Sequence, residues 1–124
     1  MRSLKLVVAI AICLLSVAVL ANASHNQFGV ANSRDVQFDN PVRVGNTLLP
    51  AGEYKVLHTM EGEDHIMVFK QQNTKKPAEV KVKCQLVKLA SVATRTEKVY
   101  AVNDAKELVL RTLVFKGDSA QHVF

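Results

Sequence analysis

The chain has 124 residues, a formal net charge of +5 at pH 7 and only two cysteines. Two cysteines are too few for a disulfide-rich scaffold, and neither lies in a CxxC or Cys/His zinc pattern. The charge is too mild to predict a specific nucleic-acid-binding protein.

Residues 1–23 predict a helical signal peptide. Arg2 and Lys5 precede a long uncharged apolar run, and Ala21 and Ala23 form an A-x-A cleavage site. We expect cleavage after Ala23, or after Ala21 as the second choice. Cleavage after Ala23 leaves 101 residues, and the loss of Arg2 and Lys5 lowers the formal charge to +3.

The leader also predicts where the protein is found. An uncleaved membrane anchor is the alternative, but the run is somewhat short for a span of roughly 20 residues, and no basic cluster follows it. We therefore expect an exported protein, periplasmic or extracellular, from a Gram-negative bacterium. After cleavage it would not span the membrane.

The rest of the chain predicts a loose segment, 24–35, followed by a single β-domain, 36–124. Short runs with alternating polar and apolar residues are separated by turn residues, a pattern typical of strands. Gly45-Asn46 is one such turn, because it can supply the positive φ angles that a tight hairpin needs. The expected strands are 36–38, 42–44, 53–60, 65–71, 78–90, 97–102 and 107–116.

"LLPAGEYKV" at 48–56 predicts a structural turn. Pro50 sets φ at the second turn position, and Gly52 can take the left-handed conformation. Tyr54 and Val56 then alternate with charged residues, which predicts that both side chains enter the core.

Two later segments carry alternatives. The alternation through Val82 and Cys84 slips after Leu86, which indicates a bulge or a bend, and Cys84 is interpreted as a small buried apolar residue. In 104–116, Asp104 is a possible helix N-cap, although the β-branched residues that follow favour a strand.

These elements predict an all-β fold, specifically a small antiparallel meander barrel. A β-sandwich of transthyretin-like type is the alternative, because both architectures suit short strands in about 100 residues.

"FDNPVRVGNTLLPAGEYKV" at 38–56 resembles the opening of small, uncharacterised exported bacterial proteins of acidobacterial type. They share the pattern F-x(3)-V-x-V-G-x(2)-L-P-A-G-x-Y-x-V. A similar turn occurs in transthyretin-like and collagen-adhesin repeat domains. The resemblance implies a β scaffold in which Pro50, Gly52 and Tyr54 are architectural, and it implies no catalytic residue.

The sequence does not favour an enzyme. No serine lies in a G-x-S-x-G motif, and the acidic residues Glu61, Glu63 and Asp64 fall on an expected exposed turn. We expect no catalytic residues and no cofactor.

One hairpin predicts weak metal-ligand candidates. If "EGED" at 61–64 closes a two- or four-residue loop, Met60 lies opposite His65 and His58 lies opposite Met67, all on one face. Imidazole and thioether ligands together suit copper. A three-residue loop would shift the register and separate them.

The first functional hypothesis is a non-catalytic binding or interaction module. Its partner is unknown, with an anionic cell-envelope polymer or another protein as candidates. The alternative is a carrier of copper or of a small apolar ligand in the barrel interior. That interior would be lined by Tyr54, Val56, Phe69, Val80, Val82, Leu108 and Leu110.

Overall fold

A computed structural model describes residues 29–124, which form nine strands and no helix. The predicted leader and residues 24–28 lie outside the described residues. The strands are β1 (Ser33–Phe38), β2 (Val42–Val44), β3 (Thr47–Leu49), β4 (Gly52–Glu61), β5 (Asp64–Gln71), β6 (Glu79–Lys88), β7 (Glu97–Val102), β8 (Leu108–Val114) and β9 (Ala120–Val123). The all-β prediction is confirmed. None of the described residues forms a helix that could cross a membrane.

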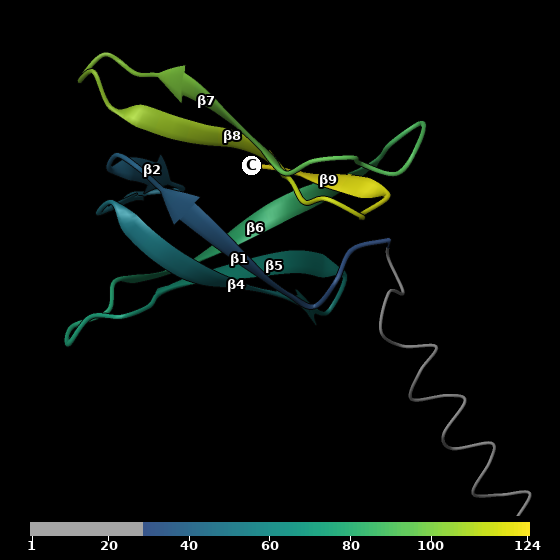
Figure 1. Cartoon of the computed structure of the whole chain (residues 1–124), viewed down its shortest axis with the longest axis horizontal. Coiled ribbons are helices and arrows are strands. Elements are labelled where there is room, and N and C mark those ends of the chain that lie inside the picture. The colour runs from purple at the N-terminus through teal and green to yellow at the C-terminus, as the bar shows by residue number, and fades with distance from the viewer. Residues whose placement is uncertain (1–28) are drawn as a thin grey trace, which may run out of the picture.

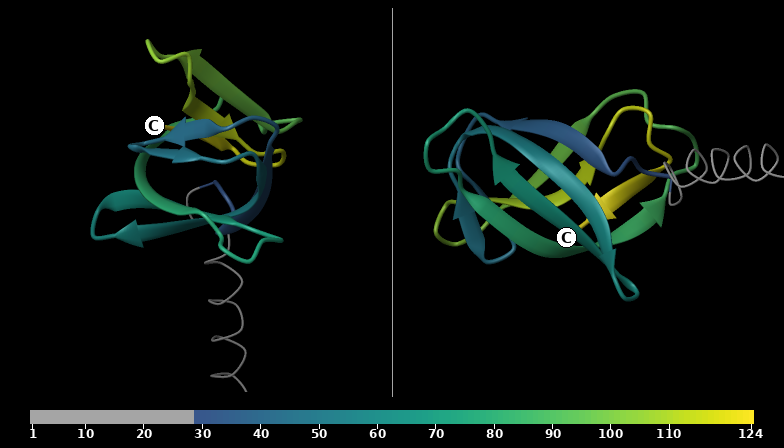
Figure 2. Two further views of the ribbon diagram at one scale, coloured as in Figure 1. Left: turned by 90° about the vertical axis from the view of Figure 1, so that its left-hand side faces the viewer. Right: turned by 90° about the horizontal axis from the view of Figure 1, so that it is seen from below.

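The strands form one curled sheet in the order β1-β4-β5-β6-β9-β8-β2-β3, with β7 on the other side of β8. In Figure 1, β4 and β5 form one layer and β7, β8 and β9 another, while β1 and β6 run obliquely between them. Two further views show the same curl from other sides (Figure 2).

The predicted antiparallel meander barrel needs two corrections. Among the strands of residues 29–124, β1 pairs only with β4 and β7 pairs only with β8, so the sheet is not closed. These edges meet through a side chain, since Lys98 Nζ donates a hydrogen bond of 2.6 Å to the Gln37 carbonyl. The pairing of β2 with β8 is also parallel, so the order is not that of a simple meander. Such a pair needs a long connection, here the chain from β3 to β7.

The predicted two-residue turn is present at the β2–β3 hairpin, but of the Gly45-Asn46 pair only Gly45 has a positive φ. Val44 pairs with Thr47 across a two-residue turn, and Gly45 has a φ of 59°. Residues with a side chain rarely adopt this backbone conformation, so glycine suits the position.

Strand β6 changes partner halfway along its length. It pairs with β5 up to Cys84 and with β9 from Gln85 onward. The predicted slip, after Leu86, lies two residues beyond this switch, and the pairing of β6 has no bulge there. At the switch the strand leaves one layer and enters the other (Figure 1). The strand is shorter than the predicted 78–90.

The helix alternative for 104–116 is wrong, because β8 is a strand. The preceding turn depends on Asn103, whose side-chain oxygen accepts a hydrogen bond of 2.9 Å from the Glu107 amide. Lys106 has a φ of 65°, which is incompatible with a right-handed helix starting at Asp104.

Both ends of the described chain are more ordered than predicted. Val30 is buried, and β1 begins at Ser33, so the described part of the expected loose segment 24–35 packs on the domain. The C-terminal residues, expected to be a short tail, form β9, which lies between β6 and β8.

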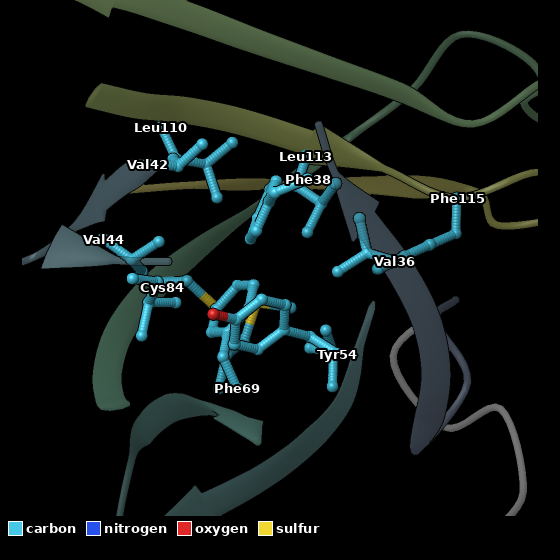
Figure 3. Close-up of a cluster of buried hydrophobic side chains, with 13 residues drawn as sticks. Val36, Phe38, Val42, Val44, Tyr54, Phe69, Cys84, Leu110, Leu113 and Phe115 are labelled. Carbon is cyan, nitrogen blue, oxygen red and sulfur yellow. The ribbon is translucent and has the colours of Figure 1, made fainter. Parts of the chain in front are cut away.

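The core fills the space between the two layers. Figure 3 shows Val42 and Leu110 on one side of it and Tyr54 and Phe69 on the other. Of the seven side chains expected to line a ligand cavity, four belong to this cluster: Tyr54, Val56, Phe69 and Leu110. Val80, Val82 and Leu108 pack against it. The packing therefore gives the apolar-ligand hypothesis no support.

Candidate metal centre

The β4–β5 hairpin has the register on which the metal prediction depended. Met60 pairs with His65 and His58 pairs with Met67, with Glu61 opposite Asp64 at the end of the hairpin. The loop is therefore two residues long, and the four side chains lie on the face that turns toward the core. His58 and Met67 are buried, while Met60 and His65 are half-buried.

Strand β6 adds a thiol to this face. Cys84 pairs directly with His65 and is only 7% exposed, so its predicted burial is confirmed. Burial raises the pKa of the Cys84 thiol to about 11, because a thiolate without a positive partner is poorly solvated there.

Strand β9 adds a third imidazole, which the sequence reasoning missed. His122 pairs with Leu86 of β6 and Leu113 of β8, and it is 1% exposed. Its Nδ1 lies 3.6 Å from Cys84 Sγ, and its ring stands edge-on to His58, with the centroids 5.2 Å apart.

Together these strands create a compact set of three ligand atoms. One nitrogen of His58, one nitrogen of His122 and the sulfur of Cys84 all lie within 4.8 Å of one another. An ion about 2.0 Å from each nitrogen and about 2.3 Å from the sulfur would hold these atoms about 3.3–3.8 Å apart. The ligand atoms are thus at most about 1 Å farther apart than they would be around a bound ion. Rotation of the side chains can close this difference.

His58 has a buried nitrogen atom that a metal ion could bind. Its Nε2 is buried and has no hydrogen-bond partner among residues 29–124. A buried polar atom left in this state costs about 1–3 kcal/mol. A bound metal ion would remove that cost.

The histidines are held in the form that binds metals. Burial, followed by the nearby His58 and His65, lowers the pKa of His122 to about 4. Burial and then His65 lower the pKa of His58, and the charge of Asp118 opposes this only partly. Both imidazoles are therefore neutral at pH 7, with a lone pair available to a metal.

The structure brings His58 of the predicted set into this centre and adds Cys84 and His122 to it. His65 lies beside the centre, its ring stacked on that of His58 at 5.3 Å. Met67 lies opposite His58 and Met60 opposite His65 on the same face. His122 alternates with the apolar residues Ala120 and Phe124, and this pattern indicates a side chain that points into the core. The pattern does not indicate which strands lie beside it.

The predicted turn residues lie away from this centre. Gly52 has a φ of 151°, which is positive but far from the left-handed helical region that we predicted. The Tyr54 hydroxyl donates a hydrogen bond of 2.6 Å to the Pro50 carbonyl. Tyr54 thereby connects the corner between β3 and β4 to the core.

The acidic turn is occupied by ion pairs. Glu61 pairs with Lys81, and Asp64 pairs with Lys83 at 3.2 Å. All four side chains are exposed, so these contacts contribute little to stability, but they neutralise part of the lysine-rich surface.

Comparison of the chain with protein-family models, with curated proteins and with solved structures finds no match. The resemblance of 38–56 to exported bacterial β-proteins therefore stays a prediction.

Proposed function

We propose that this protein is an exported, non-catalytic binding module whose ligand is a single copper ion. One observation carries the proposal: His58, Cys84 and His122 come from three different strands and place three metal-binding atoms within 4.8 Å of one another. The unpartnered Nε2 of His58 supports it independently.

The chemistry of the ligands favours copper over harder cations. Thiolate and thioether ligands select soft ions such as Cu(I), whereas carboxylate and carbonyl oxygens suit magnesium and calcium. The three-atom set contains no carboxylate. The sulfur atoms of Met60 and Met67 lie on the same face of the hairpin and could serve as weaker ligands.

The number of strong ligands also favours copper over zinc. Structural zinc sites are almost always tetrahedral with four protein ligands, whereas this centre offers three strong ligands within the described part of the chain. A trigonal arrangement of two imidazoles and one thiolate is typical of copper proteins.

The test is an anaerobic titration of the purified protein, expressed from the full chain, with Cu(I) in competition with a colorimetric chelator. We expect one tightly bound Cu(I) per chain. Cys84→Ser and His58→Gln should each weaken binding by about 100-fold or more, since they remove ligands rather than their supports.

A matched control separates loss of a ligand from loss of the fold. Leu110→Ile conserves the volume of a fully buried side chain of the core and should retain tight binding, because a leucine side chain offers a metal no ligand atom. Thermal unfolding of each variant checks that the domain is intact. If the wild type takes up no Cu(I), or if Cys84→Ser binds as tightly as the wild type, the proposed function is wrong.

A further inference from the structure

We infer that copper enters and leaves this centre through a port at the end of the β5–β6 ladder, where β6 parts from β5 and where His65 is the first protein ligand that the ion meets. This inference rests on the proposed function and adds a direction of loading to it.

Two surface hollows are lined in part by a residue of the centre, Cys84. One has a volume of about 400 Å³ and the other about 350 Å³, and both are lined by Asp64, His65, Cys84 and Gln85. Cys84 is therefore the ligand of the centre that these openings reach. His122 and His58 line neither hollow, so an ion arriving there meets His65 and Cys84 before it meets either of them.

His65 has the position that a transfer ligand requires. It is half-buried and lines both hollows. It lies directly opposite Cys84 in the β5–β6 register and stacks on His58, with the ring centroids 5.3 Å apart and the planes at 6°. An ion bound to His65 would thus lie beside the stacked ring of His58 and beside Cys84 on the neighbouring strand.

The mouth of the port does not repel a cation. Lys83 lines the larger hollow, but its Nζ lies 3.2 Å from an Asp64 carboxylate oxygen. The pair leaves the mouth close to neutral. Transfer then proceeds by exchange of ligands on the copper, with no change in its oxidation state, and the Cys84 thiol releases its proton to solvent as its sulfur binds the ion.

The test measures rates and affinity separately. Cu(I), supplied anaerobically as its acetonitrile complex, is mixed with the protein in a stopped-flow instrument, and removal of copper by an excess of chelator is followed in a second experiment. His65→Phe retains a flat ring that can stack on His58 but has no ligand atom. We expect it to slow both loading and removal by about tenfold or more, which corresponds to one lost interaction in the transition state, while the equilibrium affinity is unchanged.

Two further variants make the result specific to the imidazole. His65→Met should restore fast exchange, because a thioether also binds Cu(I). Gln85→Ala changes a residue that lines both hollows without removing a soft ligand, and it should exchange copper at the wild-type rate.

The outcomes separate this inference from the proposed function. If the wild type binds no copper, the proposed function fails first. If the wild type binds copper but His65→Phe loads equally fast, or if Gln85→Ala slows loading as much, the port is wrong and the centre stands. If His65→Phe weakens the affinity as strongly as Cys84→Ser does, His65 is a ligand of the centre itself and the port is again wrong.

Discussion

The hydroxyl group of Tyr54 offers a direct measure of what the "LLPAGEYKV" turn contributes to stability. Tyr54 is completely buried, and its hydroxyl donates to the Pro50 carbonyl at 2.6 Å. The change Tyr54→Phe removes this single bond and leaves the ring, which packs against Phe38 with the centroids 5.5 Å apart, in place.

The expected cost follows from how deeply each of the two partners is buried. A net hydrogen bond contributes about 0.5–1.5 kcal/mol, and a buried acceptor left without a partner costs about 1–3 kcal/mol. The Pro50 end of this bond is near the surface, so water can replace part of it. We therefore expect the free energy of unfolding to fall by about 1–2 kcal/mol. For a domain of this size, the melting temperature should fall by about 4–8 °C for each kcal/mol.

Urea unfolding followed by circular dichroism measures this difference, and Tyr100→Phe is its matched control. Tyr100 is half-buried on β7, and its hydroxyl has no hydrogen bond within the described part of the chain. Its removal should change stability by less than about 0.5 kcal/mol. If Tyr54→Phe is as stable as Tyr100→Phe, the bond to Pro50 does not stabilise the corner.

Three further changes test other parts of the scaffold. Gly52→Val should destabilise the domain by about 1–3 kcal/mol in urea unfolding, because φ is 151° and a Cβ would lie 3.0 Å from Gln71 Nε2; a wild-type midpoint would contradict this. Asp118→Ala leaves Arg34 without the buried carboxylate that lies 2.6 Å away, and a loss of about 2–4 kcal/mol is expected; a loss below 1 kcal/mol in the same assay would show that water compensates. The Arg43 guanidinium, through its hydrogen bonds, lowers the pKa of Glu107 to about 2. The stabilisation of the folded state by ionised Glu107 is complete above pH 4.5 and is lost as the pH falls to about 2. Between these pH values the free energy of unfolding of Glu107→Gln should therefore fall less than that of the wild type. Parallel curves of unfolding free energy against pH would refute this.

Much of the local structure was predictable because it depends on residues that are close in the chain. The Gly45-Asn46 turn sets the β2–β3 register, and the short acidic loop sets the register of His58 and His65 in the β4–β5 hairpin. In a hairpin, loop length decides which side chains share a face. The shared face of the four metal candidates was therefore accessible from the sequence.

The centre itself was only partly predictable. The alternation along β6 predicts that Cys84 is buried, and it is. The same pattern does not predict that its sulfur lies beside His122. His122 was placed in a tail, because the four residues of β9 are too few to show a clear pattern. Neither residue is close in sequence to His58, so no spacing rule connects the three.

The sequence by itself determined most of the strands, the hairpin turns and the face that carries His58, because alternation and turn geometry act over a few residues. Only the tertiary structure decided that β6 exchanges β5 for β9 after Cys84 and that β9 lies between β6 and β8. It also decided that the sheet stays open between β1 and β7. These pairings join distant segments, and burial of the whole core selects them. That selection is what brings a thiol and two imidazoles within 4.8 Å of one another.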